Sequence, residues 1–313
     1  MVEDNQIKAI VSPFAIREGE IKTFDGKDGY VSMNQIIHKI NIGHIGDIHF
    51  KILELVNEFE FITSRQIFQL LQWKGIEVNS QDKLNNKLEQ LVKTKILTRY
   101  YFNSEDGKGI YRIYCLEKMG KYLLNSRGIE CKWQPTDNTK PVAMIKKRLA
   151  GNQTLIAYLR KVKAFEGYVP KPAITAKRSG KVFKATGGSV KLVKSGKAIE
   201  FVFEVIRREE EWEKKLVDKM KLYQDFYANF QVGDSGYMSM PQLILVCEDE
   251  KHMAEVFKTI ILKQIEIPQI KLYFTTDLRQ NEETLENTLV EFVIDEETKK
   301  YKMKDVSVKL LGI

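Results

Sequence analysis

Residues 47–124 carry the periodic pattern that most constrains the fold of this chain. Apolar residues recur at helical spacing along residues 47–59, and the same spacing returns after Thr63 and again after Ser80. Thr63 and Gln66 stand three positions apart before an apolar stripe, which is the spacing of a capping box. The pattern therefore predicts three consecutive helices with short connections.

Two β-rich runs follow the third helix, at residues 96–102 and 110–116. The connector 103–109 contains Gly, Asp and Ser and predicts a hairpin loop, and residues 117–124 predict a short closing helix. Three helices followed by a β-hairpin is the order of a winged helix-turn-helix domain, which places its third helix in a DNA major groove. Winged helices that bind protein, or that only stabilise a larger fold, remain an alternative.

The third helix offers a polar outward face that contains only two carboxylates, Asp82 and Glu89. Amide and lysine side chains can pair with base edges, and lysine can also reach phosphates. We predict that six of its residues read bases: Gln81, Lys83, Asn85, Asn86, Lys87 and Gln90. Around it, four residues are predicted phosphate contacts: Arg65, Lys93, Lys108 and Arg112.

A strongly basic block lies between Lys140 and Ile199. It holds fifteen Lys or Arg and one acidic residue, Glu166, while the whole chain has a formal net charge of only +8. Such a block attracts polyanions, although a solvated Lys-rich face is the alternative. Nine residues of the block are predicted phosphate contacts: Lys146, Lys147, Arg148, Arg160, Lys161, Lys177, Arg178, Lys181 and Lys184.

The chain divides into four predicted parts. Residues 1–45 form an N-terminal arm of uncertain structure, 46–130 the winged-helix domain, 131–141 a linker with two prolines, and 142–313 a second domain. The second domain is predicted to begin with a basic helix and short strands. Its later elements are then a strand at 198–206, a helix at 207–227, a strand at 243–247, a helix at 251–264 and a strand at 270–275.

This element order resembles a restriction-endonuclease-like α/β core. The chain also resembles the plasmid replication-relaxation family, through ITSRQIFQLL, KLNNKLEQLVKTKILTR and YRIYCLEKMGKYLL in the first half. In the second half the similar segments are FVFEVIR, KLVDKMKLYQDFY, PQLILVCED and KLYFTTD. Winged-helix antitoxin-regulators with a nuclease-like domain are a second similar group. The resemblance implies an α+β multidomain protein whose nuclease-like domain is catalytically degenerate.

A nuclease of this fold needs an acidic residue on one strand and Glu-x-Lys or Asp-x-Lys on the next, to hold Mg²⁺ and activate water. Glu200 and Glu204 lie on the expected strand, but Val202 and Ile206 occupy the positions where the lysine belongs. No acidic residue lies between Glu166 and Glu200. We therefore predict no catalytic residue, metal site or cofactor, and expect Glu204 to pair with a basic neighbour. A nuclease with a displaced active site is the alternative.

Cysteine usage and the N-terminus bear on the compartment. The three cysteines have no metal-binding spacing, and their scarcity fits a reducing cytoplasm. The first residues lack a signal-peptide pattern, and no apolar run reaches the roughly 18 residues of a membrane span.

The sequence thus predicts a cytoplasmic, sequence-specific double-stranded DNA-binding protein. The resemblance implies a plasmid or mobile-element role in replication, conjugation or transcriptional control. A homodimer and replication or conjugation proteins are left open as further partners, and a module that docks an acidic protein is the competing interpretation.

Overall fold

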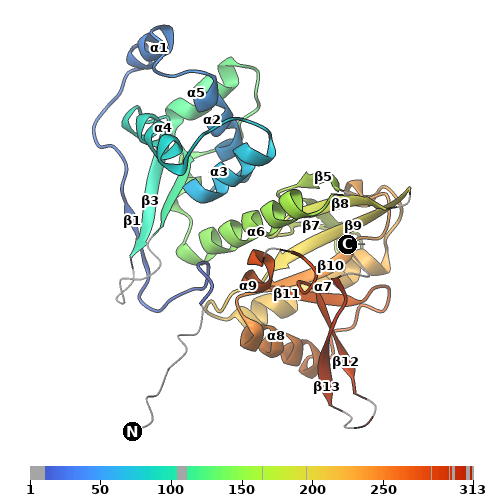
Figure 1. The fold of residues 1–313 in the computed structure, drawn as a ribbon. Coiled ribbons are helices and arrows are strands. Elements are labelled where there is room, and N and C mark those ends of the chain that lie inside the picture. The colour runs from blue at the N-terminus through green and yellow to red at the C-terminus, as the bar shows by residue number, and fades with distance from the viewer. Residues whose placement is uncertain are drawn as a thin grey trace.

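The computed structural model describes residues 11–103, 111–163, 165–194, 196–282, 284–295, 297, 300–307 and 311. The chain has a mixed α+β architecture with two larger sheets and a two-stranded one (Figure 1). Among the described residues, no helix has the length and apolar character needed to cross a membrane.

The first unit contains the helices and the hairpin in the predicted order. Its elements are α2 (Asp47–Phe59), β2 (Ile62–Thr63), α3 (Ser64–Trp73), α4 (Gln81–Lys93), β3 (Leu97–Asn103), β4 (Arg112–Leu116) and α5 (Lys118–Ser126). The predicted capping box is present, because Thr63 Oγ1 accepts from Gln66 N at 3.2 Å and Gln66 Oε1 accepts from Thr63 N at 3.1 Å. Strands β3 and β4 pair antiparallel, while most of their predicted connector (104–110) lies outside the described residues.

The N-terminal residues, left without a predicted structure, extend this unit and reach the second one. Strand β1 (Ile21–Phe24) pairs antiparallel with β3, so the sheet order is β1-β3-β4-β2, and α1 (Met33–Asn41) follows. Before β1, the hydroxyl of Ser12 donates to the carboxylate of Asp277, far along the chain.

The second unit is built on a seven-stranded sheet of order β13-β12-β11-β10-β9-β8-β5. These strands are β5 (Phe165–Val169), β8 (Ser189–Lys194), β9 (Lys197–Val205), β10 (Gln242–Cys247), β11 (Leu272–Thr276), β12 (Val290–Ile294) and β13 (Tyr301–Asp305). Strands β9, β10 and β11 are mutually parallel, and the other pairs are antiparallel.

Alternate residues of β9 point to opposite faces of this sheet, as the period of a strand requires. Phe201 and Phe203 belong to a core shared with α6 (Val142–Lys161) and the first unit. Val202 belongs to a second core with α7 (Trp212–Ala228) and α8 (Glu250–Leu262). The two-stranded sheet of β6 (Ala173–Ala176) and β7 (Lys181–Lys184) also packs on this second core.

Helix α6 holds the two units together (Figure 1). Its Asn152 is completely buried, and its Nδ2 donates to the backbone oxygens of Phe59, at 3.2 Å, and Phe61, at 2.7 Å. From the other side, Gln66 Nε2 of α3 donates to Leu149 O at 2.8 Å. The apolar core is continuous across this junction.

Some predicted boundaries differ from the structure. The segment 131–141, predicted as a linker, holds a short 3-10 helix (η1, Pro135–Thr139), and its Asn138 donates to Leu116 O at 2.8 Å. The helix predicted over 207–227 begins at Trp212, because Glu211 before it has a left-handed backbone conformation with φ 54°. The short helix α9 (Asp277–Asn281) and the β12–β13 hairpin had no sequence prediction.

Replacing Asn152 with Leu tests how much the α6 junction contributes to stability. The variant keeps the side-chain volume but removes this donor from Phe61 O and from Phe59 O, of which Phe59 O still accepts from Phe61 N at 3.0 Å. An unsatisfied buried group costs about 1–3 kcal/mol. We expect a lower free energy of unfolding in urea denaturation. The control is Asn57→Ala, a change at a half-buried amide that donates to Glu130 O, which should stay within about 0.5 kcal/mol of the parent.

Candidate nucleic-acid interface

Helix α4 packs one face into the first unit and leaves the other to solvent. Ser80 caps it, accepting from Lys83 N at 3.2 Å. Its inner face is formed by four buried residues: Leu84, Leu88, Leu91 and Val92. Of the predicted base-reading residues, Lys83, Asn86 and Gln90 are exposed; the half-buried ones are Gln81, Asn85 and Lys87. The apolar stripe therefore fixes which face the helix presents.

Some of these polar side chains are engaged within the unit. Gln81 Nε2 donates to Asn85 Oδ1 at 3.2 Å. Gln90 Oε1 lies 2.7 Å from His49 Nε2, while His49 Nδ1 accepts from Gly46 N, so His49 donates to Gln90. By contrast, the side chains of Lys83, Asn86 and Lys87 make no hydrogen bond or ion pair with another described residue, which leaves them available to a ligand.

One of the two carboxylates on α4 is neutralised. Glu89 accepts from Arg99 Nη1 at 2.6 Å and lies 3.6 Å from Lys93 Nζ. Although partial burial opposes the shift, the hydrogen bond and charge of Arg99 hold the pKa of Glu89 below its ordinary value. Asp82 is exposed in the first turn, where the helix dipole favours a carboxylate. The outward face of α4 thus consists mainly of lysine and amide side chains.

The three phosphate contacts predicted elsewhere in the first unit have different surroundings. Arg65 is exposed on α3. Arg112 is exposed on β4, but its Nε lies 3.2 Å from Asp25 Oδ2, which offsets its charge. Lys108 lies outside the described residues.

The prediction of phosphate contacts is wrong for Lys146 and Arg148, because α6 is buried between the units. Lys146 is 1% exposed and its Nζ lies 2.5 Å from both Glu20 Oε2 and Ala15 O. Burial lowers the pKa of Lys146, and Glu20 opposes that shift. Arg148 is 8% exposed and donates to Pro170 O at 2.7 Å.

Several other cations of the basic block are engaged by internal partners. Lys147 pairs with Glu209, and Lys177 Nζ lies 2.6 Å from Asp234 Oδ2. Lys161 donates to two backbone oxygens at α9. These three lysines were predicted phosphate contacts, and their charged groups are instead bound by internal partners.

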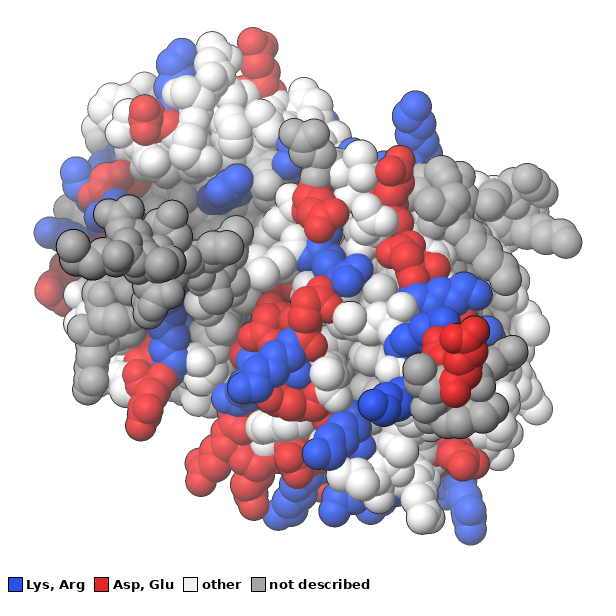
Figure 2. All heavy atoms as spheres, turned by 60° about the horizontal axis from the view of Figure 1, so that its bottom comes forward, with Lys and Arg blue, Asp and Glu red and all other residues white. Residues whose placement is uncertain are grey.

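The remaining predicted phosphate contacts of the block are exposed but do not form one surface. Arg160 ends α6, whereas the others belong to the β6–β7 hairpin, which packs on the opposite face of the sheet: Arg178, Lys181 and Lys184. On the face in Figure 2, basic and acidic side chains lie interspersed. The exposed cations of the block are therefore divided between the two faces of the sheet.

The strand glutamates are held by hydrogen bonds. Glu204 accepts from Thr186 Oγ1 and Tyr223 OH, both at 2.9 Å, and lies 3.6 Å from Lys219 Nζ, so it has the expected basic neighbour. Glu200 accepts from Ser239 N at 2.7 Å. No group of three or more His, Cys, Asp or Glu within the described residues has metal-binding geometry.

The carboxyl ends of the parallel strands hold a buried ion pair that the sequence did not predict. Arg207 follows β9 and is fully buried, and its Nη2 lies 2.8 Å from both carboxylate oxygens of Asp277, which follows β11. Ser12 donates to the same carboxylate. The position of Asp277 directly after an apolar strand was the available signal, since carboxyl ends of parallel strands share one sheet edge.

Comparison with known proteins includes a distant structural similarity. No family model matches the chain, and no curated protein matches it. Among solved structures, the restriction endonuclease FokI aligns with a TM-score of 0.25 and 10% sequence identity. The alignment covers 74% of this chain and 42% of the FokI chain, and a similarity this distant does not identify an activity.

Substituting Lys146 with Met tests its structural role. The variant leaves Glu20, whose side chain is 5% exposed, charged and without its partner, and breaking a buried pair costs about 3–5 kcal/mol. We expect a correspondingly lower free energy of unfolding in urea.

The exposed Lys181→Met is the matched control and should change stability by less than about 0.5 kcal/mol. Adding Glu20→Gln to Lys146→Met should recover part of the loss. Equal stability of the Lys146 and Lys181 variants would contradict the assignment.

Proposed function

We propose that this chain is a sequence-specific double-stranded DNA-binding protein. The observation that carries the proposal is the solvent face of α4, where Lys83, Asn86 and Lys87 have no partner among the described residues. One carboxylate of the helix, Glu89, is neutralised by Arg99. An α-helix fits the major groove, where amides pair with base edges and lysines reach acceptors or phosphates.

The first unit is, in this proposal, a winged helix with α4 as its recognition helix and the β3–β4 hairpin as its wing. Its support is the element order α2, β2, α3, α4, β3, β4 and the antiparallel pairing of β2 and β3 with β4. Helix α3 would cross the DNA backbone, with Arg65 beside a phosphate.

The biological setting is a proposal of its own. The resemblance of the chain's segments to the plasmid replication-relaxation family supports a role in replication, conjugation or transcriptional control of a mobile element. A symmetric motif among duplexes selected from random DNA would indicate that two copies bind together.

The second unit is, in this proposal, a nuclease-like scaffold that binds without cutting. Its support is the state of the strand glutamates: Glu204 is held by Thr186 and Tyr223, and Glu200 by Ser239. We expect supercoiled plasmid to stay intact during incubation with the protein and Mg²⁺ or Mn²⁺. Nicking that disappears in a Glu204→Gln variant would reverse this assignment.

The DNA-binding proposal is tested by shift assays with a duplex recovered by selection and with a scrambled duplex. Asn86→Ala should reduce the difference in binding free energy between the selected and the scrambled duplex by about 1–3 kcal/mol, since it removes a base contact. Lys93→Met should weaken both duplexes alike and lower the slope of log affinity against log salt by about 1, since it removes a phosphate contact.

Lys251→Met, on the exposed start of α8, is the matched control and should leave both affinities unchanged. No duplex binding at low salt would contradict the proposal and would favour a module that docks an acidic protein. Equal fractional losses of specific and non-specific binding in the Asn86 variant would contradict its assigned role in base reading, and a loss confined to the specific duplex in the Lys93 variant would contradict its assigned role as a phosphate contact.

A further inference from the structure

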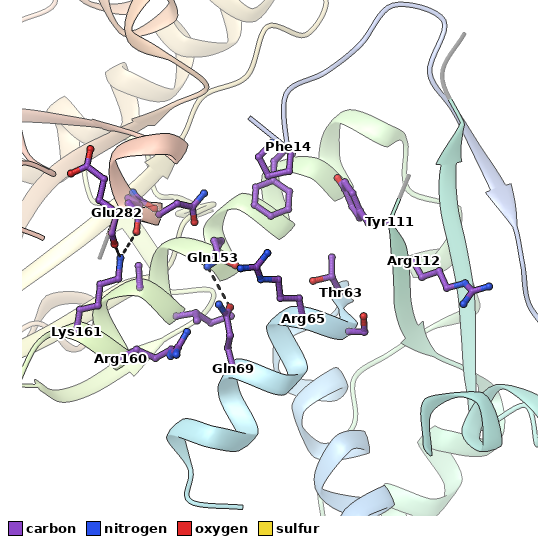
Figure 3. A pocket seen from close by; sticks show the side chains of 16 residues that line it. Phe14, Thr63, Arg65, Gln69, Tyr111, Arg112, Gln153, Arg160, Lys161 and Glu282 are labelled. Carbon is purple, nitrogen blue, oxygen red and sulfur yellow. Dashed lines mark hydrogen bonds between the residues drawn. The ribbon is translucent and has the colours of Figure 1, made fainter. Parts of the chain in front are cut away.

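A pocket of about 770 Å³ lies where the two units meet (Figure 3). Its walls come from the start of α3, the second half of α6, α9 and the N-terminal arm. This volume lies within the roughly 300–1,000 Å³ that small-molecule sites occupy. Phe14, Ile156 and Ala157 give it an apolar part, and the remaining wall is mostly polar.

The pocket wall is strongly cationic. It holds Arg65, Arg112, Arg160 and Lys161 against one carboxylate residue, Glu282. Within the described chain, neither Arg65 nor Arg160 has an ion pair or a hydrogen bond. In Figure 3 these two side chains, one from each unit, extend toward the space between α3 and α6. Both also line an adjoining hollow.

The first turn of α3 opens into the same pocket. Thr63 and Ser64 line it, and the Thr63 hydroxyl caps only the N–H of Gln66. The other N–H groups of a first helical turn have no intrahelical acceptor, and the helix dipole adds partial positive charge there. Helix N-termini of this kind bind phosphate and other anions.

Two buried donors in the wall provide independent evidence for a missing acceptor. Gln280 is 2% exposed, and its Nε2 has no hydrogen-bond partner in the described part of the chain. The hydroxyl of Tyr111, also in the wall, is buried and lacks a partner among the same residues. Because buried polar groups are nearly always hydrogen-bonded, these donors indicate an acceptor supplied by a ligand.

We propose that this pocket binds the phosphate group of a phosphorylated ligand. Arg65 and Arg160 would hold it by charge-assisted hydrogen bonds, the α3 N-terminus would donate backbone N–H groups, and Gln280 would donate its amide. Guanidinium groups match phosphate oxygens in geometry, and such bonds are stronger than neutral ones. The group could come from a free nucleotide or from a DNA strand, since both carry this chemistry.

A ligand held there would join the units, because Arg65 belongs to α3 and Arg160 to α6. It would therefore stabilise the folded chain, and the stabilisation would rise with the logarithm of ligand concentration above the Kd. The proposal does not depend on DNA being the main partner.

The test uses the full chain with inorganic pyrophosphate and with ATP, at about 50 mM salt because screening weakens such contacts. Calorimetric titration and thermal melting should show saturable binding and a rise in Tm. Arg65→Met with Arg160→Met should weaken affinity on the order of 10-fold or more, since both charge-assisted contacts are lost. Gln280→Leu should weaken binding without lowering the stability of the free protein, since it removes an unsatisfied buried amide.

Lys181→Met with Lys184→Met is the control, since it removes two exposed charges from the β6–β7 hairpin, outside the pocket. Absence of binding by the parent protein, or equal weakening in the arginine and control variants, would overturn the proposal.

Competition with a short duplex identifies the source of the phosphate. If ATP and the duplex compete for the parent protein, and this competition is lost in the Arg65→Met, Arg160→Met variant, the pocket binds a phosphate of the DNA strand. Simultaneous binding of both indicates a free nucleotide. ATP binding by a protein that binds no duplex would refute the DNA proposal and leave this one standing.

Discussion

The docking of α6 between the two units is the interaction on which the rest of the structure depends. Asn152 and Gln66 donate side-chain hydrogen bonds to backbone carbonyls across this junction, and such bonds satisfy polar groups that the packing buries. The apolar core continues through the helix from the first unit to the large sheet. Because both units share this core, residues of α3 and α6 keep a fixed relation to each other, which is a requirement for any site built from both.

The same docking explains the fate of the basic block. Burying a cationic helix requires partners for its charges, since an unpaired buried charge costs several kcal/mol. Those partners come from outside the block: Glu20 for Lys146, and Glu209 for Lys147. Much of the charge that suggests a polyanion surface is therefore used inside the protein. Exposed cationic side chains remain on α4, at the α3–α6 junction and on the β6–β7 hairpin.

Two of these places, α4 and the α3–α6 junction, make different chemical demands. The face of α4 is an exposed helix surface with amides and lysines, which suits recognition of base edges in a groove. The junction pocket is concave, bears two guanidinium groups without partners in the described chain, and has buried donors in its wall. It suits a compact anion. A protein that uses both would connect DNA recognition to the relative position of its units.

The sequence by itself determined many of the local elements and the inner faces of α2, α3 and α4, because periodicity and capping act over a few residues. The Thr63–Gln66 capping box, the helix start after Ser80 and the buried strand β9 were all predictable in this way. Only the tertiary structure decided the burial of Lys146, the Arg207–Asp277 pair and the junction pocket, since each joins segments distant in sequence. The sequence around a helical lysine does not show whether its side chain faces water or a glutamate from another unit. Only the packing of the units decides between these two environments.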